Sequence, residues 1–103
     1  MSIAPVQSVI VQFRCALPVD VEVGREVWRV ALSYYNKGHR AEITAASSTG
    51  RSGVFADGRA RAVESQLRRG ISVPVGSIRH RIALALAARG AVSLLVLQDD
   101  DLM

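Results

Sequence analysis

The chain of 103 residues contains one cysteine, one lysine and five aromatic residues. A single cysteine excludes an internal disulfide bond, and no basic segment precedes an apolar block at the N-terminus. These features predict a cytoplasmic protein without a signal peptide, in a bacterial cell or the interior of a host cell. No apolar run reaches the length of about 18 residues that a membrane-spanning helix needs. The longest candidate, residues 82–97, is interrupted by Arg89 and Gly90.

Motifs for catalysis and metal binding are also absent. The two histidines, His39 and His80, each lie beside a basic residue, and no Cys–His or paired-cysteine spacing occurs. We therefore expect no bound metal and no cofactor. No nucleophile-elbow sequence accompanies the serines, so the pattern favours binding over catalysis. The three consecutive carboxylates at 99–101 point in different directions and indicate a solvated acidic tail.

Half of the residues are hydrophobic, which is enough for the core of one domain over residues 1–103. Residues 1–7 read as a loose lead-in and residues 99–103 as the acidic tail. The net charge is +4, and twelve of the thirteen basic residues are arginine. Arginine suits phosphate contacts. The same composition is typical of GC-rich coding or of an overprinted viral reading frame, so a phage or viral origin remains open.

Three glycines, Gly38, Gly70 and Gly90, each follow a helix-like stretch and precede a strand-like run. Glycine commonly ends helices because it adopts left-handed backbone angles without a Cβ clash. We expect helices that begin after Asp20, Asp57 and Ser77. Strands are expected at residues 8–17, 40–46, 71–75 and 91–97.

This order predicts an α/β fold, a small βαβαβαβ-like parallel sheet of about four strands with three helices. Alternation in the first strand places Cys15 on a buried face as a structural thiol, together with Val9, Val11 and Phe13. The second helix shows a narrow apolar stripe of Ala60, Val63 and Leu67. The third helix is apolar nearly all round and should be the most buried.

An α+β alternative stays open. Residues 27–35 and 40–46 also fit two strands of a hairpin joined by the loop 36–39, because Val, Trp and Tyr favour strands and a four-residue loop with glycine suits a hairpin. In that fold the second strand would run in the opposite direction.

In an open parallel sheet, ligands bind beyond the carboxyl ends of the strands. Two segments there favour anions. The first belongs to a glycine-rich loop predicted at 47–58 and resembles a phosphate-binding loop in its chemistry, without matching a phosphate-loop motif: Ser47, Ser48, Thr49, Gly50, Arg51, Ser52 and Gly53. The second is the start of the third helix, which carries Ser77, Arg79, His80 and Arg81. A parallel sheet would bring both segments to one edge.

The second helix carries further arginines: Arg59, Arg61, Arg68 and Arg69. Glu64 lies at i+3 and i−4 from Arg61 and Arg68, so helical pairing of these charges is expected. A basic stripe that contacts nucleic-acid phosphates is the alternative. Trp28 and Tyr35 are candidates for an exposed aromatic interface.

Three functions follow from these features. The first is a small accessory protein that acts by protein–protein interaction, with homo-oligomers expected. The second is an arginine-rich protein that binds RNA or DNA. The third is an enzyme for a phosphate-bearing ligand, which would use the two anion-favouring segments.

Overall fold

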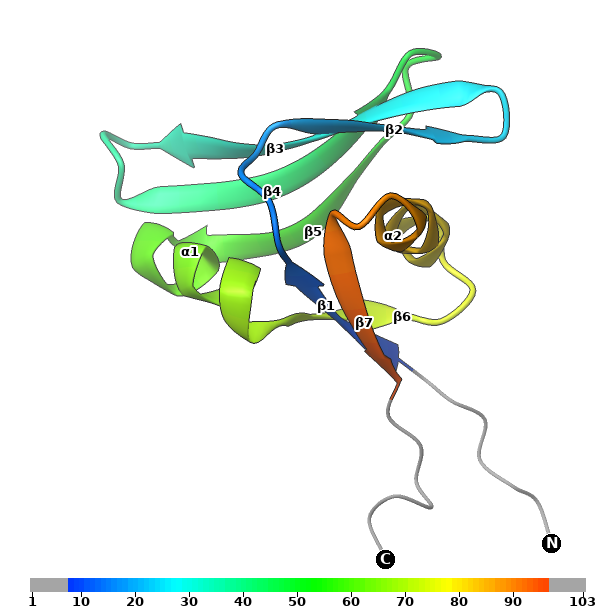
Figure 1. The fold of residues 1–103 in the computed structure, drawn as a ribbon. Coiled ribbons are helices and arrows are strands. Elements are labelled where there is room, and N and C mark those ends of the chain that lie inside the picture. Colours follow the sequence, from blue (N-terminus) through cyan, green and yellow to red (C-terminus); the bar gives the residue numbers. More distant parts are fainter. Residues whose placement is uncertain (1–7, 97–103) are drawn as a thin grey trace, which may run out of the picture.

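The computed structural model describes residues 8–96 (Figure 1). The elements in chain order are β1 (Ser8–Phe13), β2 (Val19–Val23), β3 (Glu26–Tyr35), β4 (Arg40–Ser47), β5 (Ser52–Arg59), α1 (Ala60–Arg69), β6 (Ile71–Pro74), α2 (Ile78–Ala88) and β7 (Val92–Val96). The predicted lead-in at 1–7 and the predicted acidic tail at 99–103 lie outside the described residues. Within residues 8–96, neither helix has the length and apolarity that crossing a membrane requires.

The strands form two antiparallel sheets. One sheet has the order β2-β3-β4-β5, and the other has the order β6-β1-β7. The molecule is therefore an α+β protein, and the predicted single parallel sheet with three helices is wrong. The alternative α+β interpretation, with a hairpin within residues 27–46, is confirmed.

Each helix contacts both sheets. Helix α1 contacts β1, β4 and β5, while α2 contacts β2, β5, β6 and β7. Figure 1 shows the four-stranded sheet above the helices, with β1 and β7 passing between them. The core consists of the side chains that these layers enclose, and the largest of its fully buried residues are Trp28, Ile43, Ile82 and Leu86.

The segment predicted as the first helix forms β2 and β3 instead. In β3, Trp28 and Val30 point inward and are fully buried, whereas Arg29 between them is exposed. This period of two is the pattern of a strand with one buried face. Asn36, Lys37 and Gly38 all have positive φ angles, so the chain reverses there in a tight turn and Gly38 ends no helix.

The second predicted helix is confirmed as α1, with Ala60 and Val63 buried and Leu67 partly buried. Its predicted cap is wrong, because Asp57 lies in β5 and the helix begins after Arg59, whose side chain makes no capping hydrogen bond. The predicted loop at 47–58 is wrong for the same reason: β5 occupies most of it. Gly70 follows α1 at φ 129°, and a Cβ there would lie 2.3 Å from Ile10 Cγ2. Both features require glycine.

The third predicted helix is confirmed as α2, and Ser77 caps it by accepting a hydrogen bond from the His80 N–H at 3.2 Å. One face is buried through Ile82, Ala83 and Leu86, but Leu84 remains 49% exposed, so the helix is not enclosed on all sides. The predicted strands at 71–75 and 91–97 correspond to β6 and β7. The first strand ends at Phe13, so Cys15 lies beyond it and is exposed rather than buried.

Candidate interaction groove

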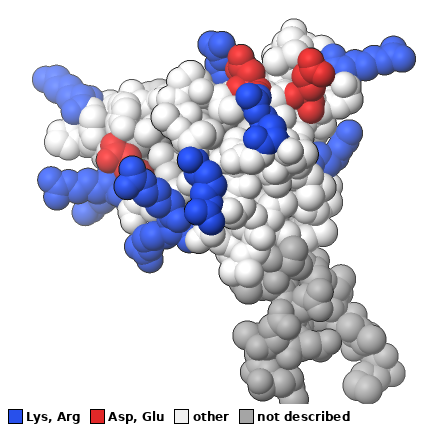
Figure 2. All heavy atoms as spheres, in the orientation of Figure 1, with Lys and Arg blue, Asp and Glu red and all other residues white. Residues whose placement is uncertain are grey.

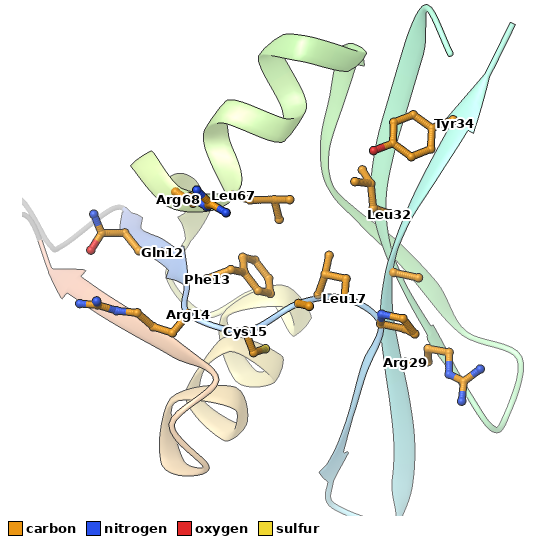
Figure 3. A pocket seen from close by; sticks show the side chains of 13 residues that line it. Gln12, Phe13, Arg14, Cys15, Leu17, Arg29, Leu32, Tyr34, Leu67 and Arg68 are labelled. Carbon is orange, nitrogen blue, oxygen red and sulfur yellow. The ribbon is translucent and has the colours of Figure 1, made fainter. Parts of the chain in front are cut away.

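A groove of about 1010 Å³ separates α1 from β3. The segment 14–18, which connects β1 to β2, forms a third wall (Figure 3). The residues that line the groove are Gln12, Phe13, Arg14, Cys15, Ala16, Leu17, Pro18, Arg29, Ala31, Leu32, Tyr34, Leu67 and Arg68. The groove therefore draws on three parts of the chain that are far apart in sequence.

The centre of the groove is apolar. In Figure 3, Phe13, Leu17, Leu32 and Leu67 point toward the same space from β1, the connecting segment, β3 and α1. Phe13 is buried and packs edge-on against Phe55, with the ring centroids 6.3 Å apart. The three leucines are only partly buried against the core. They therefore offer apolar surface that a ligand or another chain would cover.

An unpaired length of strand borders this apolar centre. Strand β2 begins at Val19, which lies opposite Val30, whereas β3 continues to Tyr35. Val27 accepts a hydrogen bond from Ser48 N–H at 2.9 Å, so the backbone groups of Val27 face β4. Because these groups alternate along an antiparallel strand, those of Leu32 and Tyr34 face away from β4. Within residues 8–96, β4 is the only strand that pairs with residues 31–35 of β3, so their other side is an open edge.

The charged residues that line the groove are all arginines: Arg14, Arg29 and Arg68. The Arg14 Nε donates to Ser93 Oγ at 2.7 Å, a neutral partner. Arg29 extends away from the apolar centre (Figure 3) and pairs with Asp20 at 2.9 Å. This hydrogen bond from Arg29 lowers the pKa of the Asp20 carboxyl. No carboxylate occurs among the described lining residues, and because Asp20 neutralises Arg29, the positive charge of the rim comes from Arg14 and Arg68.

Tyr34 closes one end of the groove by donating a hydrogen bond to Glu64 of α1 at 2.6 Å. The pKa of Tyr34 is raised, mainly because this bond to a carboxylate favours the protonated phenol. Glu64 was expected to pair with Arg61 and Arg68, yet neither forms a salt bridge with it. Glu64 instead accepts the hydrogen bond of the exposed Tyr34, because the β3–β4 hairpin brings this tyrosine next to α1.

The arginines of the second predicted helix accordingly project into solvent from α1 and the residue before it: Arg59, Arg61, Arg68 and Arg69. Among the described residues, none of the four lies within 4 Å of a carboxylate. Figure 2 shows Lys and Arg side chains gathered on the side of the molecule where α1 lies. Arg68 belongs to both this basic surface and the groove.

The segment predicted to bind phosphate forms the tight turn between β4 and β5. Thr49 N–H and Arg51 N–H donate to Ser47 Oγ, Gly50 N–H donates to Ser47 O, and Ser48 N–H donates to Val27 O. These groups are therefore engaged inside the turn rather than directed at an anion. Ser52 and Gly53 are ladder residues of β5, opposite Ala46 and Ala45.

Arg51 in this turn also has partners. Its guanidinium pairs with Glu26 at 2.9 Å and lies 5.6 Å from the centre of the Trp28 ring. A hydrogen bond from Thr49 is the main reason that the pKa of Glu26 is lowered, and Arg51 acts in the same direction. Trp28 is fully buried, so of the two proposed interface aromatics only Tyr35, which is 48% exposed, lies at the surface.

At the start of α2, the predicted anion-binding residues mainly serve the fold. Ser77 caps the helix, and His80 Nδ1 accepts a hydrogen bond from Gly76 N–H at 3.1 Å. The Arg79 side chain donates to Val54 O at 2.9 Å, which joins the helix to β5. Arg81 is exposed. Arg79 and Arg81 belong to α2, whereas Arg61, Arg68 and Arg69 belong to α1, and Figure 1 shows the two helices on either side of β1.

Three groove residues, Leu17, Leu32 and Leu67, received no functional role from the sequence. The one local signal was Pro18, since proline cannot donate a ladder hydrogen bond and strands often begin beside it. Comparison of the chain with protein-family models, with curated proteins and with solved structures found no match.

Proposed function

We propose that this protein acts by protein–protein interaction, through an extended segment of a partner that lies in the groove beside β3. The observation that carries the proposal is the unpaired edge at residues 31–35, which adjoins the partly buried leucines of the groove. A strand that is added to a sheet edge gains main-chain hydrogen bonds, and adjacent pockets for alternate side chains supply specificity. Leu32 and Tyr34 provide such main-chain groups.

The electropositive rim favours a partner segment that carries carboxylates between apolar residues. Apolar side chains would cover Leu17, Leu32 and Leu67, while carboxylates would approach Arg14 and Arg68. Carboxylates bind arginine with charge-assisted hydrogen bonds that are stronger than neutral ones. Exposed edges are also a recognised cause of self-association, which agrees with the expected homo-oligomer.

The test uses a fluorescein-labelled peptide of eight residues in which Asp and Leu alternate. We expect its fluorescence anisotropy to rise on binding of the full chain, with an affinity that falls as salt increases. Leu32→Glu should weaken binding about tenfold or more, because it removes an apolar contact and repels the peptide carboxylates. Leu84→Glu is the matched control, since Leu84 is exposed on α2 and does not line the groove.

Equal affinities of the wild type and Leu32→Glu would contradict the proposal, as would the absence of binding at low salt. Circular dichroism and thermal unfolding of both variants verify that they are folded. A peptide of the same composition with its Asp residues replaced by Lys should bind much more weakly, because the groove rim is electropositive.

A second candidate function is the binding of RNA or DNA by the basic surface of α1. It is favoured by the observation that Glu64 bonds Tyr34 and forms no salt bridge with Arg61. Arg69 also has no carboxylate within 4 Å among the described residues and bonds only the neutral Ser65, so both arginines can contact phosphates. A labelled 20-nucleotide RNA or DNA should then shift at low salt, and Arg61→Glu with Arg69→Glu should abolish the shift. Neither arginine belongs to the groove, so unchanged peptide binding by this variant would separate the two functions.

A further inference from the structure

The charges of this chain are segregated along the sequence. All thirteen basic residues lie between Arg14 and Arg89, whereas three of the nine acidic residues form the run 99–101. The described residues thus carry thirteen basic and six acidic side chains, a net charge of +7, beside a terminal segment with a charge of −3. A segment with the charge that the groove rim attracts is therefore present in the chain itself.

The sequence of this segment also matches the groove in polarity. Residues 98–103 read Gln-Asp-Asp-Asp-Leu-Met, so that three carboxylates are followed by two large apolar side chains. The groove offers arginines at its rim and the side chains of Leu17, Leu32 and Leu67 at its centre. Carboxylates near Arg14 and Arg68, with apolar side chains beside the leucines, would satisfy both sets of groups.

The direction of β7 favours an acidic segment, residues 98–103, that comes from another copy of the chain. Strands β1 and β7 are antiparallel, and Val96 lies opposite Val9, whereas the groove begins at Gln12 and Phe13 and extends away from Val9. Four residues of strand separate these levels by about 13 Å. Residues 97–101 span about 17 Å at most and would have to reverse direction. Within one copy, the carboxylates would reach only the near end of the groove.

We propose that residues 98–103 of a second copy occupy the groove, so that each copy supplies an acidic segment to the other. This inference rests on the proposed function, because it names the partner segment for the same groove. A reciprocal exchange gives a closed two-fold dimer, in which both grooves are filled by the same contact. The contact depends on charge, so the dimer should dissociate as salt is raised.

The first measurement is the dimer dissociation constant of the full chain by sedimentation equilibrium at 50 and 500 mM NaCl. The variant D99N/D100N/D101N removes the three carboxylates with little change in shape, and it should raise the dissociation constant at least tenfold at low salt. The control E22Q/E42Q/D57N neutralises three acidic residues of the four-stranded sheet. Because both variants change the net charge by the same amount, an equal effect of the two would overturn the proposal.

The second measurement tests the contact directly through Cys15, the single cysteine, which is exposed and lines the groove. In the full-chain variant Asp101→Cys, mild oxidation should link the introduced thiol to Cys15. Mixing ¹⁵N-labelled and unlabelled copies before oxidation should give peptide pairs of mixed isotope, which mass spectrometry identifies. Ser72→Cys, at an exposed position of β6 outside the groove lining, should give far less linkage to Cys15.

The outcomes separate this inference from the proposed function. The exchange of segments is overturned if the disulfide forms only within single copies. It is also overturned if no disulfide forms and D99N/D100N/D101N has the same dimer dissociation constant as the wild type. If the Asp–Leu peptide still binds and Leu32→Glu still weakens it, the groove accepts a different partner and the proposed function stands. If neither the peptide nor the acidic segment occupies the groove, and RNA instead protects Cys15 from alkylation, both proposals fail.

Discussion

The two halves of β3 have equal length but opposite surroundings. Residues 26–30 pair with β2 on one side and β4 on the other, and they contain the fully buried Trp28 and Val30. Residues 31–35 pair only with β4, and they end in two tyrosines that are about half exposed. Residues 26–30 of β3 therefore belong to the core, whereas residues 31–35 form an open sheet edge.

The difference arises from where β2 begins. Pro18 precedes Val19, and the segment 14–18 leaves the sheet to join β1 in the other sheet. The segment 14–18 therefore does not pair with β3 beyond Val30, although β3 continues for five more residues to Tyr35. Strand edges of this kind are usually blunted by charge or covered. Here the open edge faces a groove with apolar walls, the site at which we propose that a partner segment binds.

The strongest test of the comparison is Trp28→Ala in the paired half. Trp28 is fully buried between the sheet and the layer below it, so truncation leaves a large cavity. We expect the free energy of unfolding to fall by about 3–5 kcal/mol. The control Tyr35→Ala, in the open half, should have a much smaller effect in the same denaturant titration. Equal losses would show that the two halves do not differ in packing.

A pair of proline substitutions tests the edge itself. Alternation from Val27 places Ser33 N–H toward β4, opposite Glu42, and Tyr34 N–H toward the open edge. Ser33→Pro should lower the free energy of unfolding by about 1–3 kcal/mol, because it leaves a ladder acceptor without its donor. Tyr34→Pro should destabilise the fold less, yet it should abolish any binding that needs the edge. Similar unfolding curves for the two variants would contradict this assignment of the backbone groups.

The sequence predicts the elements that depend on neighbouring residues better than those that depend on residues far apart in the chain. The apolar stripe predicts α1 and the Ser77 cap predicts α2, because both signals lie within a few residues of each other in the sequence. The apolar pattern of the β2–β3 region predicts a helix instead of two strands, because Val27 and Ala31 are apolar although they lie on the outer face of β3. Those residues disguise the period of two and also fit helical spacing.

The groove could not be predicted for a related reason. Leu17, Leu32 and Leu67 line one groove only because the pairing of β2 with β3 begins at Val19 and α1 packs against β4, and both facts depend on long-range contacts. The arginines of α1 were recognised from sequence, but their relation to Glu64 was not. Tyr34 lies thirty residues from Glu64, so helical spacing alone favoured an arginine partner.

Acid should weaken the paired half of β3 selectively. The pKa of Glu26 is lowered mainly by a hydrogen bond from Thr49, and the pKa of Asp20 is lowered mainly by its bond with Arg29. A carboxyl with a depressed folded-state pKa stabilises the fold above its unfolded value of about 4 and loses that contribution as the pH falls through the folded value. The stability gap between the wild type and Glu26→Gln should therefore be full at pH 7 and close below pH 4. Chemical denaturation across that range measures it, and a constant gap would contradict the pairing.

Alkali should act on the open half instead, and this is the smallest effect expected. The bond to Glu64 raises the pKa of Tyr34, so its contribution is present below the unfolded value of about 10 and is lost as the pH rises through the folded value. The chain has two tyrosines, so the absorbance titration of the wild type minus that of Tyr34→Phe isolates Tyr34. Its midpoint should lie above 10, and Glu64→Gln should move it back toward that value. A midpoint that Glu64→Gln leaves unchanged would mean that β3 and α1 are not joined across this end of the groove.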